Sequence, residues 1–301
     1  MNEYRLVTKE ERENILPVLK AFGIDTDEEI FRFIDTKLDK IYDVYLINNS
    51  EKIVIKKSNK QNSDIITYNN YFNGNDFSVP KILKNIEINS DYYVEMPFVK
   101  GTDARGCSIL DAERIGKALA EIQSFYLQKP EKSERLANYF ENHLLKHINK
   151  VKPYYKDYEA IFTYVENRFF EVPMTVIHDD LLPINIFIDG EDINIIDWEY
   201  AQILPYFMDL ARFAYIYDME NKMNISEFSA NSFMESYYSE MKKNIGFKIN
   251  YKDFYIDVAI SALLQYVLFL SYGLEYNKEK AMESLDNKYF KKILDYLKQS
   301  V

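Results

Sequence analysis

The first hundred residues alternate between short apolar runs and polar turns, a pattern typical of an antiparallel sheet. Residues 41–47 and 51–57 are rich in β-branched side chains, and the Asn-Asn-Ser between them indicates a hairpin turn. Residues 79–88 and 91–99 form a second predicted strand pair, and residues 63–73 are predicted to be helical. We therefore expect a small antiparallel sheet with one inserted helix.

Beyond Gly101 the apolar positions follow a helical period instead. Residues 108–127 carry apolar side chains at 109, 112, 115, 119, 122 and 125, which form one stripe along a helix. Short strands are expected at 174–177, 186–188 and 193–196. The other predicted helices are 8–22, 133–150, 154–170, 206–218, 226–244, 251–275 and 278–299.

This change of pattern predicts an α+β protein with two lobes. We expect an N-terminal lobe over residues 1–96, a short connection over 97–101, and a mainly helical lobe over 102–301. The longest apolar run, residues 258–274, contains Gln and Ser, so we interpret it as a buried core helix and expect no membrane partner.

Charge and cysteine content narrow the possible functions. The 301 residues include 37 basic and 48 acidic side chains, for a formal net charge of −11. This balance argues against nucleic-acid binding, which needs a basic surface, and it favours cationic small-molecule partners. Solubility alone is the other explanation of the acidic excess. Cys107 is the only cysteine and the N-terminus has no apolar signal core, so we expect a cytoplasmic location.

Residues 175–201 combine apolar strand-like runs with carboxylates, although a buried carboxylate is costly unless it is paired or binds a metal. His178, Asp180 and Asn185 fit the pattern H-x-D-x-x-x-x-N in "HDDLLPIN", and Asp197 follows in "IIDWE". The stretch therefore indicates a functional site.

These motifs resemble the catalytic loop and the metal-binding Asp of the aminoglycoside phosphotransferase and choline kinase superfamily, which shares the protein-kinase fold. Upstream, "IVIK" resembles the strand that carries a kinase lysine, "VEMPFVKG" the hinge, and "GKALAEIQS" the helix after it. The resemblance covers roughly residues 40–215. It implies a bilobal protein-kinase-like fold, with a small antiparallel N-terminal lobe that contains one helix and a larger helical C-terminal lobe.

The resemblance implies a role for each polar residue of the loop. Asp180 is expected to accept the proton of the acceptor hydroxyl or to orient that hydroxyl, and His178 to hydrogen-bond backbone as a structural member of the loop. Asn185 and Asp197 are expected to bind Mg²⁺, which prefers oxygen ligands. A turn at "DGED" would fold residues 193–196 back beside 186–188 and bring both oxygens to one cleft.

The resemblance also implies a nucleotide site. Lys56 is expected to bind the α- and β-phosphates. No Glu lies between Lys56 and Val79, so Asp64 is the candidate partner of this lysine. Adenine is expected to pair with the carbonyl of Pro97 and the N–H of Val99, with Met96 behind the base. Residues 33–47 contain no glycine, so phosphate contacts of this loop are not evident from sequence.

Asp179, Glu199 and Tyr200 are the candidate acceptor-binding residues. For Asp179 the alternative is a solvated turn, because the family has a variable Gly or Asn at its position. Asp209, in "FMDLARF", is expected to be structural at the start of helix 206–218, and Trp198 is expected in the core.

We therefore expect an enzyme that uses ATP (or GTP) and Mg²⁺ to phosphorylate a hydroxyl of a small cationic molecule. The acceptor would be an aminoglycoside-like antibiotic, which implies antibiotic resistance, or an amino alcohol such as choline or ethanolamine. The alternative hypothesis is a catalytically weak, kinase-like nucleotide-binding scaffold or assembly protein, supported by the missing Glu and glycines. The sequence does not indicate an oligomeric state.

Overall fold

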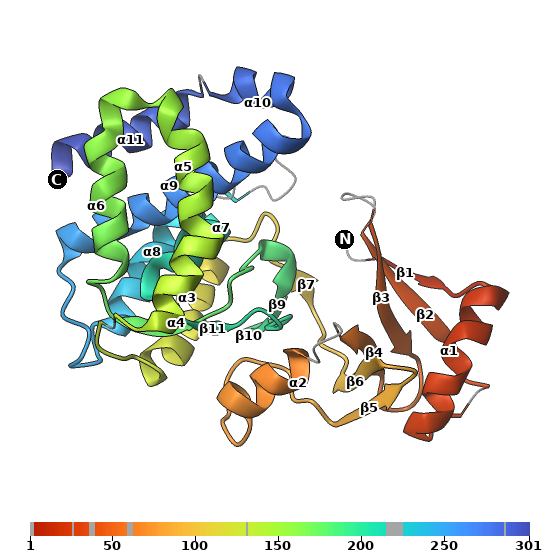
Figure 1. Cartoon of the computed structure of the whole chain (residues 1–301). Helices are drawn as coiled ribbons and strands as arrows, with labels where there is room; N and C mark the ends of the chain where they lie inside the picture. Colours follow the sequence, from red (N-terminus) through yellow and green to blue (C-terminus); the bar gives the residue numbers. More distant parts are fainter. Residues whose placement is uncertain are drawn as a thin grey trace. The chain divides into compact units, whose positions relative to one another are not determined.

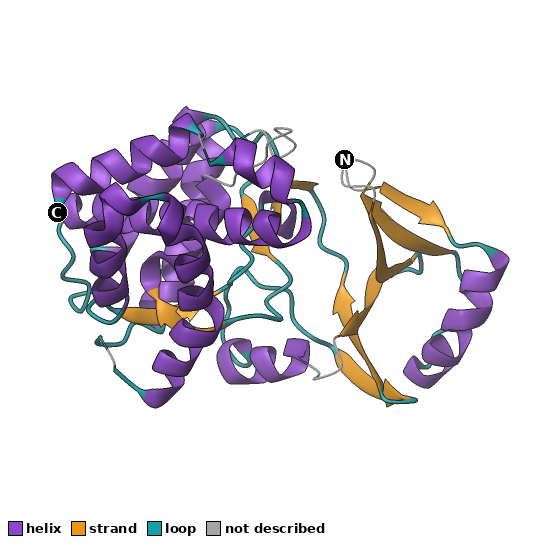
Figure 2. Cartoon of the chain, turned by 45° about the horizontal axis from the view of Figure 1, so that its top comes forward, coloured by secondary structure: helices purple, strands orange, loops and turns teal. Residues whose placement is uncertain are grey.

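The computed structural model describes residues 3–25, 27–35, 40–58, 63–130, 132–214, 225–285 and 287–301, and they divide into two compact units (Figure 1). Unit 1 contains the described residues up to Cys107 together with Pro183–Ala201. Unit 2 contains those of Ser108–Leu182 and those from Gln202 onward. Strands dominate unit 1 and helices dominate unit 2 (Figure 2).

Unit 1 is built on a six-stranded antiparallel sheet with the order β1–β2–β3–β4–β6–β5. Its strands are β1 (Glu3–Leu6), β2 (Ile30–Asp35), β3 (Lys40–Ile47), β4 (Ile53–Ser58), β5 (Lys84–Ile88) and β6 (Asp91–Pro97). In the central strand β4, Lys56 pairs with Val44 of β3 on one side and Val94 of β6 on the other. Lys56 therefore lies in a strand that is paired on both sides.

Helix α1 (Lys9–Phe22) covers part of this sheet. Its first turn is closed by a capping box between Thr8 and Glu11, and Gly23 ends it in the left-handed conformation. Ile15 and Leu19 project from α1 into the core of unit 1 with strand residues such as Ile47. The predicted helix 8–22 is confirmed.

Several predicted strands need correction. Residues 79–83 are not in a strand, and β5 begins at Lys84; Pro80 has no N–H to donate to a ladder. Strands β1 and β2 were not predicted, since β1 has only four residues and β2 carries charged Arg32 within its apolar run. The predicted helix 63–73 is confirmed as α2 (Ser63–Thr67) with a π-helical turn at Tyr68–Phe72.

A second sheet in unit 1 contains the predicted hairpin. Strands β9 (Ile186–Asp189) and β10 (Asp192–Ile195) pair antiparallel, and β7 (Thr102–Asp103) adds to β9. Gly101 lies so close to β9 that a Cβ there would be 2.0 Å from the Ile188 carbonyl oxygen. This approach admits only glycine.

Unit 2 is mainly helical, as predicted. Its longer helices are α3 (Ile109–Phe125), α6 (Glu159–Phe169), α8 (Glu227–Met241), α9 (Tyr251–Tyr276) and α11 (Lys288–Ser300). Shorter segments are α4 (Glu134–Tyr139), a π-helical turn at Phe140–Leu145, α5 (Lys146–Val151), 3₁₀ turns at Lys152–Tyr154, Lys156–Tyr158 and Tyr206–Asp209, α7 (Leu210–Ala214) and α10 (Lys278–Ser284). The predicted helix 278–299 is thus two helices.

The predicted helices 154–170 and 206–218 also begin differently, because 3₁₀ turns precede α6 and α7. Residues 215–218 of the second prediction lie outside the described residues. By length and composition, α9 could cross a membrane, yet 72% of its most apolar window is buried in the structure. This burial agrees with its interpretation as a core helix.

Strand β8 (Met174–Ile177) pairs antiparallel with β11 (Gln202–Pro205), a strand that the apolar pattern did not predict. Residues 178–182 follow β8 directly, so this pairing anchors the start of the predicted catalytic loop in unit 2. The remainder of that motif, from Pro183, belongs to unit 1. The domain boundaries at 96 and 101 stay a prediction.

Candidate active site

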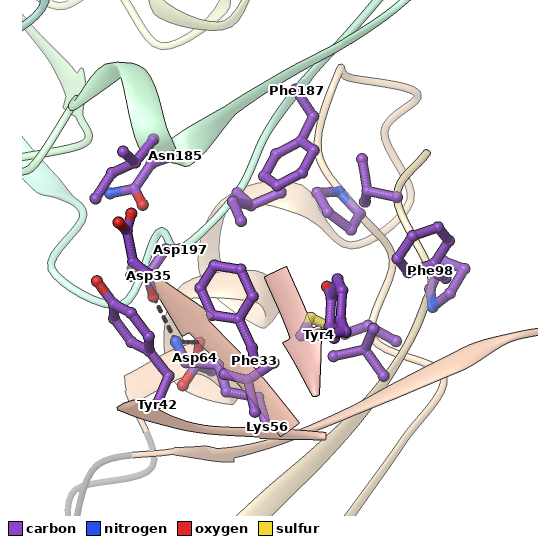
Figure 3. Close-up of a pocket in the computed structure, with 18 residues that line it drawn as sticks. Tyr4, Phe33, Asp35, Tyr42, Lys56, Asp64, Phe98, Asn185, Phe187 and Asp197 are labelled. Atoms are coloured by element: carbon purple, nitrogen blue, oxygen red, sulfur yellow. Dashed lines mark hydrogen bonds and ion pairs between the residues drawn. The ribbon is translucent and has the colours of Figure 1, made fainter. Parts of the chain in front are cut away.

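Unit 1 contains a cavity whose wall includes most of the predicted nucleotide-binding residues (Figure 3). Lys56 of β4 and Asp64 of α2 lie at one side. Aromatic and apolar side chains form most of the remaining wall. The members of this cavity that were predicted from sequence are Lys56, Asp64, Met96, Pro97, Val99, Asn185 and Asp197.

Lys56 is surrounded by carboxylates. Its Nζ lies 2.8 Å from Asp64 Oδ1 and also donates to Asp197 Oδ1 (Figure 3). Glu199 Oε2 lies 3.5 Å from the same nitrogen. Burial alone would lower the pKa of this ammonium, but the charges of Asp197, Asp64 and Glu199 outweigh burial and raise it. Lys56 therefore remains charged and holds three acidic side chains together.

Asp64 occupies the place expected for the missing Glu. It opens α2, and its backbone N–H donates to the Ser58 hydroxyl at the end of β4 over 3.4 Å. This contact draws the start of α2 toward the sheet, so that the short carboxylate reaches Lys56. Among the described residues, the buried Asp64 Oδ2 has no hydrogen-bond partner.

The cavity also contains the predicted metal ligands. Asp197 has a φ of 66°, and the N–H of neighbouring Ile196 donates to the carbonyl of Asn185 over 2.8 Å. Asn185 and Asp197 are thereby brought into one wall. Asp64, Asp197 and Glu199 each offer an oxygen within 4.8 Å of the others. An all-oxygen donor set of this kind suits a hard cation such as Mg²⁺.

The hinge residues Met96, Pro97 and Val99 line the same cavity. Pro97 ends β6 opposite Ile53, and the next residue, Phe98, donates its N–H to the Lys52 carbonyl over 3.0 Å. Their contacts with adenine stay a prediction, since no base is present to test them.

Aromatic residues of the cavity were missed by the sequence reasoning. The ring of Tyr4 lies 5.4 Å from that of Phe33 and 6.0 Å from that of Phe98. Phe33 begins the glycine-free segment 33–47, whose residues 36–39 lie outside the described part of the chain. Flat apolar side chains gathered in this way suit a planar ring.

A buried ion cluster adjoins the base of that segment. Asp35 lines the cavity, and its Oδ2 accepts from Arg105 Nη1 over 3.0 Å. Arg105 also donates to both carboxylate oxygens of Asp103, and all three side chains are at most 6% exposed. The cluster joins the end of β2 to β7. Asp35 and Arg105 are 70 positions apart in the chain, so the sequence pattern did not indicate this contact.

In unit 2, Asp209 binds the backbone of the loop that follows β8. Its buried carboxylate accepts the backbone N–H of His178 over 2.7 Å and that of Asp179 over 3.0 Å. Gln123 of α3 donates to the same group over 3.0 Å. Burial raises the pKa of Asp209 to about 7, although the two backbone N–H donors counteract this rise. Asp209 was predicted to be structural, and in the structure it fixes the backbone of residues 178 and 179.

His178 is fully buried, and its Nδ1 accepts the N–H of Asp180 over 3.3 Å. This is the kind of backbone contact expected for His178. Asp180 Oδ1 accepts from Arg212 of α7 at 2.6 Å (Nη2) and 3.2 Å (Nε). The guanidinium therefore orients the carboxylate that was predicted to meet the acceptor. Arg212 was missed, although it lies three residues after Asp209 in the quoted motif.

The Asp179 side chain is hydrogen-bonded within unit 2 and does not lie in a solvated turn. Its Oδ2 accepts from the Tyr139 hydroxyl over 3.4 Å and from Gln202 Nε2 over 3.2 Å. Burial raises its pKa to about 6, and these two hydrogen bonds oppose the rise. Its φ of 65° lies in the left-handed region, which Gly and Asn adopt more readily than other residues.

The other two acceptor candidates lie elsewhere. Glu199 faces Lys56 in unit 1, and Tyr200 is 54% exposed. Neither lines the cavity of unit 2 that contains Asp179. Their acceptor roles stay a prediction. Trp198 is 5% exposed and packs edge-on against Phe72 at 4.8 Å, as expected of a core residue.

Comparisons with solved structures agree with this fold. A choline kinase from Cryptosporidium parvum Iowa II is 12% identical, with a TM-score of 0.55 over 96% of this chain and 94% of that chain. An aminoglycoside phosphotransferase from Alicyclobacillus acidocaldarius is 14% identical, with a TM-score of 0.55 over 89% and 91%. The predicted α+β kinase-like fold class is thus confirmed.

A third similar structure is a thermostable mutant of the aminoglycoside phosphotransferase APH(4)-Ia in a ternary complex with AMP-PNP and hygromycin B. It is 12% identical, with a TM-score of 0.50 over 97% of this chain and 99% of that chain. The comparison with curated proteins gives no match. The model of the family described as "Phosphotransferase enzyme family" (APH) matches residues 59–231, more than half of the chain. The protein therefore belongs to the phosphotransferase enzyme family.

Proposed function

We propose that this phosphotransferase transfers the γ-phosphate of ATP to a hydroxyl group of a small cationic molecule. The observation that carries the proposal is the cavity of unit 1, which brings Lys56, Asn185 and Asp197 together with the hinge residues Met96–Val99. A lysine for phosphates, oxygen ligands for a cation and an apolar wall for a base are the parts that phosphoryl transfer from a nucleotide requires.

Lys56 would bind the α- and β-phosphates, with Asp64 holding its ammonium in place. Asn185 and Asp197 would bind Mg²⁺, which neutralises developing charge on the phosphates when it is bound. The donor chemistry fits this ion, because Asn185 and Asp197 both offer oxygen ligands at the cavity wall and one buried oxygen of Asp64 lacks a partner among the described residues.

Asp180 would accept or orient the acceptor hydroxyl, and Arg212 would hold its carboxylate in one direction. The cationic nature of the acceptor is supported by the net charge of −11 and by the presence of Asp179 beside Asp180. Similar structures include a choline kinase and an aminoglycoside phosphotransferase, and both acceptor classes carry amines.

The experiment is an ATP-turnover assay of the purified protein over a panel of amino alcohols and aminoglycosides, with ADP release and transfer of labelled phosphate both measured. We expect labelled product with at least one cationic acceptor and none without Mg²⁺. The variant Asp197→Ala should weaken Mg²⁺-ATP binding, as read from the shift in unfolding temperature on titration.

Nucleotide binding without transfer to any acceptor would favour the scaffold hypothesis instead. An unchanged Mg²⁺ dependence in Asp197→Ala would remove the role proposed for that carboxylate. Asp189→Ala is the matched control, since Asp189 lies in the exposed hairpin turn of the same segment.

A further inference from the structure

Unit 2 contains its own cavity, of about 470 Å³, which falls within the usual size range of small-ligand sites. Its charged side chains are Asp179, from the loop after β8, and Arg212, from α7. The rest of the wall is aromatic, apolar or neutral: Tyr139, His143, Leu144, Met208, Gln265, Leu268, Phe269 and Tyr272.

The two neighbouring carboxylates differ in their partners. Asp180 is engaged by the guanidinium of Arg212 at 2.6 Å, so its charge is largely compensated inside the protein. The hydrogen-bond donors to Asp179 Oδ2 are the Tyr139 hydroxyl and the Gln202 amide, which are neutral. Neutral donors orient a carboxylate without cancelling its charge. The Arg212 guanidinium also attracts Asp179, but its ion pair is with Asp180, so Asp179 still gives the cavity an acidic group that a bound cation would complete.

The backbone at Asp179 makes this arrangement costly. Asp179 has a left-handed φ of 65°, a conformation that costs more for a residue with a side chain than for glycine. Burial of the carboxylate adds a desolvation cost on top of this strain. Tyr139, stacked on His143 at 4.8 Å, and Gln202 come from separate elements to meet Asp179. The side chain is thus held in position at the expense of stability, as expected of a binding group.

We propose that Asp179 is a specificity-determining residue that binds the ammonium group of the acceptor, leaving Asp180 to meet its hydroxyl. This inference rests on the proposed function, since it assigns part of the acceptor site. The ligand class is a small molecule with one ammonium group and a nearby hydroxyl. The rings of Phe269 and Tyr272, which also line the cavity, would add cation–π contacts around that ammonium.

One ammonium matches the cavity better than several. Arg212 lines the same cavity, and a second cationic group of the ligand would be repelled by its guanidinium unless Asp180 were released. We therefore expect an amino alcohol to bind more tightly, relative to its size, than a polycationic aminoglycoside.

The test measures binding, so that it does not depend on turnover. Isothermal titration of the full chain with ethanolamine, choline and hygromycin B is compared with ethylene glycol, which keeps the hydroxyl and lacks the charge. We expect ethanolamine to bind at least tenfold more tightly than ethylene glycol. In Asp179→Asn, which keeps the shape and tolerates the left-handed conformation, this preference should fall at least tenfold.

Asp189→Asn serves as the matched control, because it removes one carboxylate from an exposed turn and should leave the preference intact. Asp179→Gly also removes the carboxylate, but without backbone strain. Its preference for ethanolamine over ethylene glycol should fall as in Asp179→Asn. An unfolding temperature at or above that of the wild type would show that the glycine variant is folded.

The outcomes separate the inference from the proposed function. Asp179-dependent binding of ethanolamine without phosphorylation of any acceptor would support the inference and count against the kinase function. Phosphorylation of an amino alcohol with unchanged KM in Asp179→Asn would overturn the inference and leave the function standing. Equal binding of ethanolamine and ethylene glycol to the wild type would also overturn it, as would tighter binding of hygromycin B that Asp179→Asn does not affect.

Discussion

Two clusters of carboxylates in this protein handle their charge in opposite ways. Around Lys56 in unit 1, Asp64, Asp197 and Glu199 share one buried ammonium. In unit 2, the adjacent Asp179 and Asp180 have different environments, because Arg212 pairs with Asp180 while neutral donors orient Asp179. The first cluster is suited to holding a cationic centre in place, and the second to presenting one carboxylate to a ligand.

Removal of the shared cation should produce the largest effect. In Lys56→Met, three carboxylates would face one another without compensation, so we expect the free energy of unfolding to fall by about 3 kcal/mol. Added Mg²⁺ should restore more stability to this variant than to the wild type, since a cation can replace the ammonium. Chemical denaturation with and without Mg²⁺ measures both effects.

Lys57→Met is the matched control, because the pair of Lys57 with Asp91 is about one-third exposed and should contribute less than about 1 kcal/mol. Equal losses in the two variants would mean that Lys56 does not organise the acidic cluster.

The next largest effect is expected on turnover, from substitution of Asp180, the carboxylate of unit 2 that pairs with Arg212. Asp180→Asn should lower turnover roughly 10²-fold or more and leave ATP binding unchanged, since it removes a proton acceptor without altering the cavity of unit 1. Single-turnover transfer of labelled phosphate is the measurement. Normal turnover in Asp180→Asn combined with loss of turnover in Asp179→Asn would reverse the roles of the two residues.

Cation binding at the other carboxylate should depend on pH. Burial raises the pKa of Asp179 to about 6, so the charge is present above that value and is lost as the pH falls through it. Affinity for ethanolamine should therefore fall about tenfold from pH 8 to pH 5, as the ionised fraction drops below roughly one-tenth.

The groups that face Asp179 are Tyr139, Gln202, Arg212, Asp180 and Asp209, and His143 stacks on Tyr139. Asp179→Asn retains all of them. A pH dependence that persists in this variant would therefore belong to His143 or to another neighbour.

The smallest expected effect is on stability. Asp179→Gly should raise the free energy of unfolding by about 1 kcal/mol at pH 8, because it removes both the left-handed strain and a buried charge. Gly190→Ala provides the converse case in an exposed turn with a φ of 61°, and should lower stability by a similar amount. A loss of stability in Asp179→Gly would show that the hydrogen bonds of the carboxylate outweigh its cost.

Local patterns predicted elements better than boundaries. The β9–β10 hairpin was predictable because apolar alternation and the turn "DGED" act over a few residues. Strands β1, β2 and β11 were not, since their extended conformation is stabilised by pairing with distant partners rather than by their own residues. The helix predicted over 278–299 missed the break after Ser284, although Asn287 marks the start of α11 as its N-cap.

The residues of the candidate site also differ in how far the sequence could predict them. Lys56, Asp180, Asn185 and Asp197 were identified as candidates because their types and spacing resemble the motifs of the family, and phosphoryl transfer needs a lysine, an acid and oxygen ligands. Asp64 was chosen as partner of Lys56 because no Glu lies between Lys56 and Val79 and Asp64 is the only acid at the start of the predicted helix 63–73. The structure places Lys56 Nζ 2.8 Å from Asp64 Oδ1.

The sequence by itself thus determined which groups are available and in which order they occur. Only the tertiary structure decided which carboxylate faces which cation. Asp179 and Asp180 are neighbours in sequence, but their carboxylates accept from different partners. Arg212, Tyr139 and Gln202 then reach them from three different elements. Electrostatic partners are set by distances in space, and these distances exist only once the chain has folded.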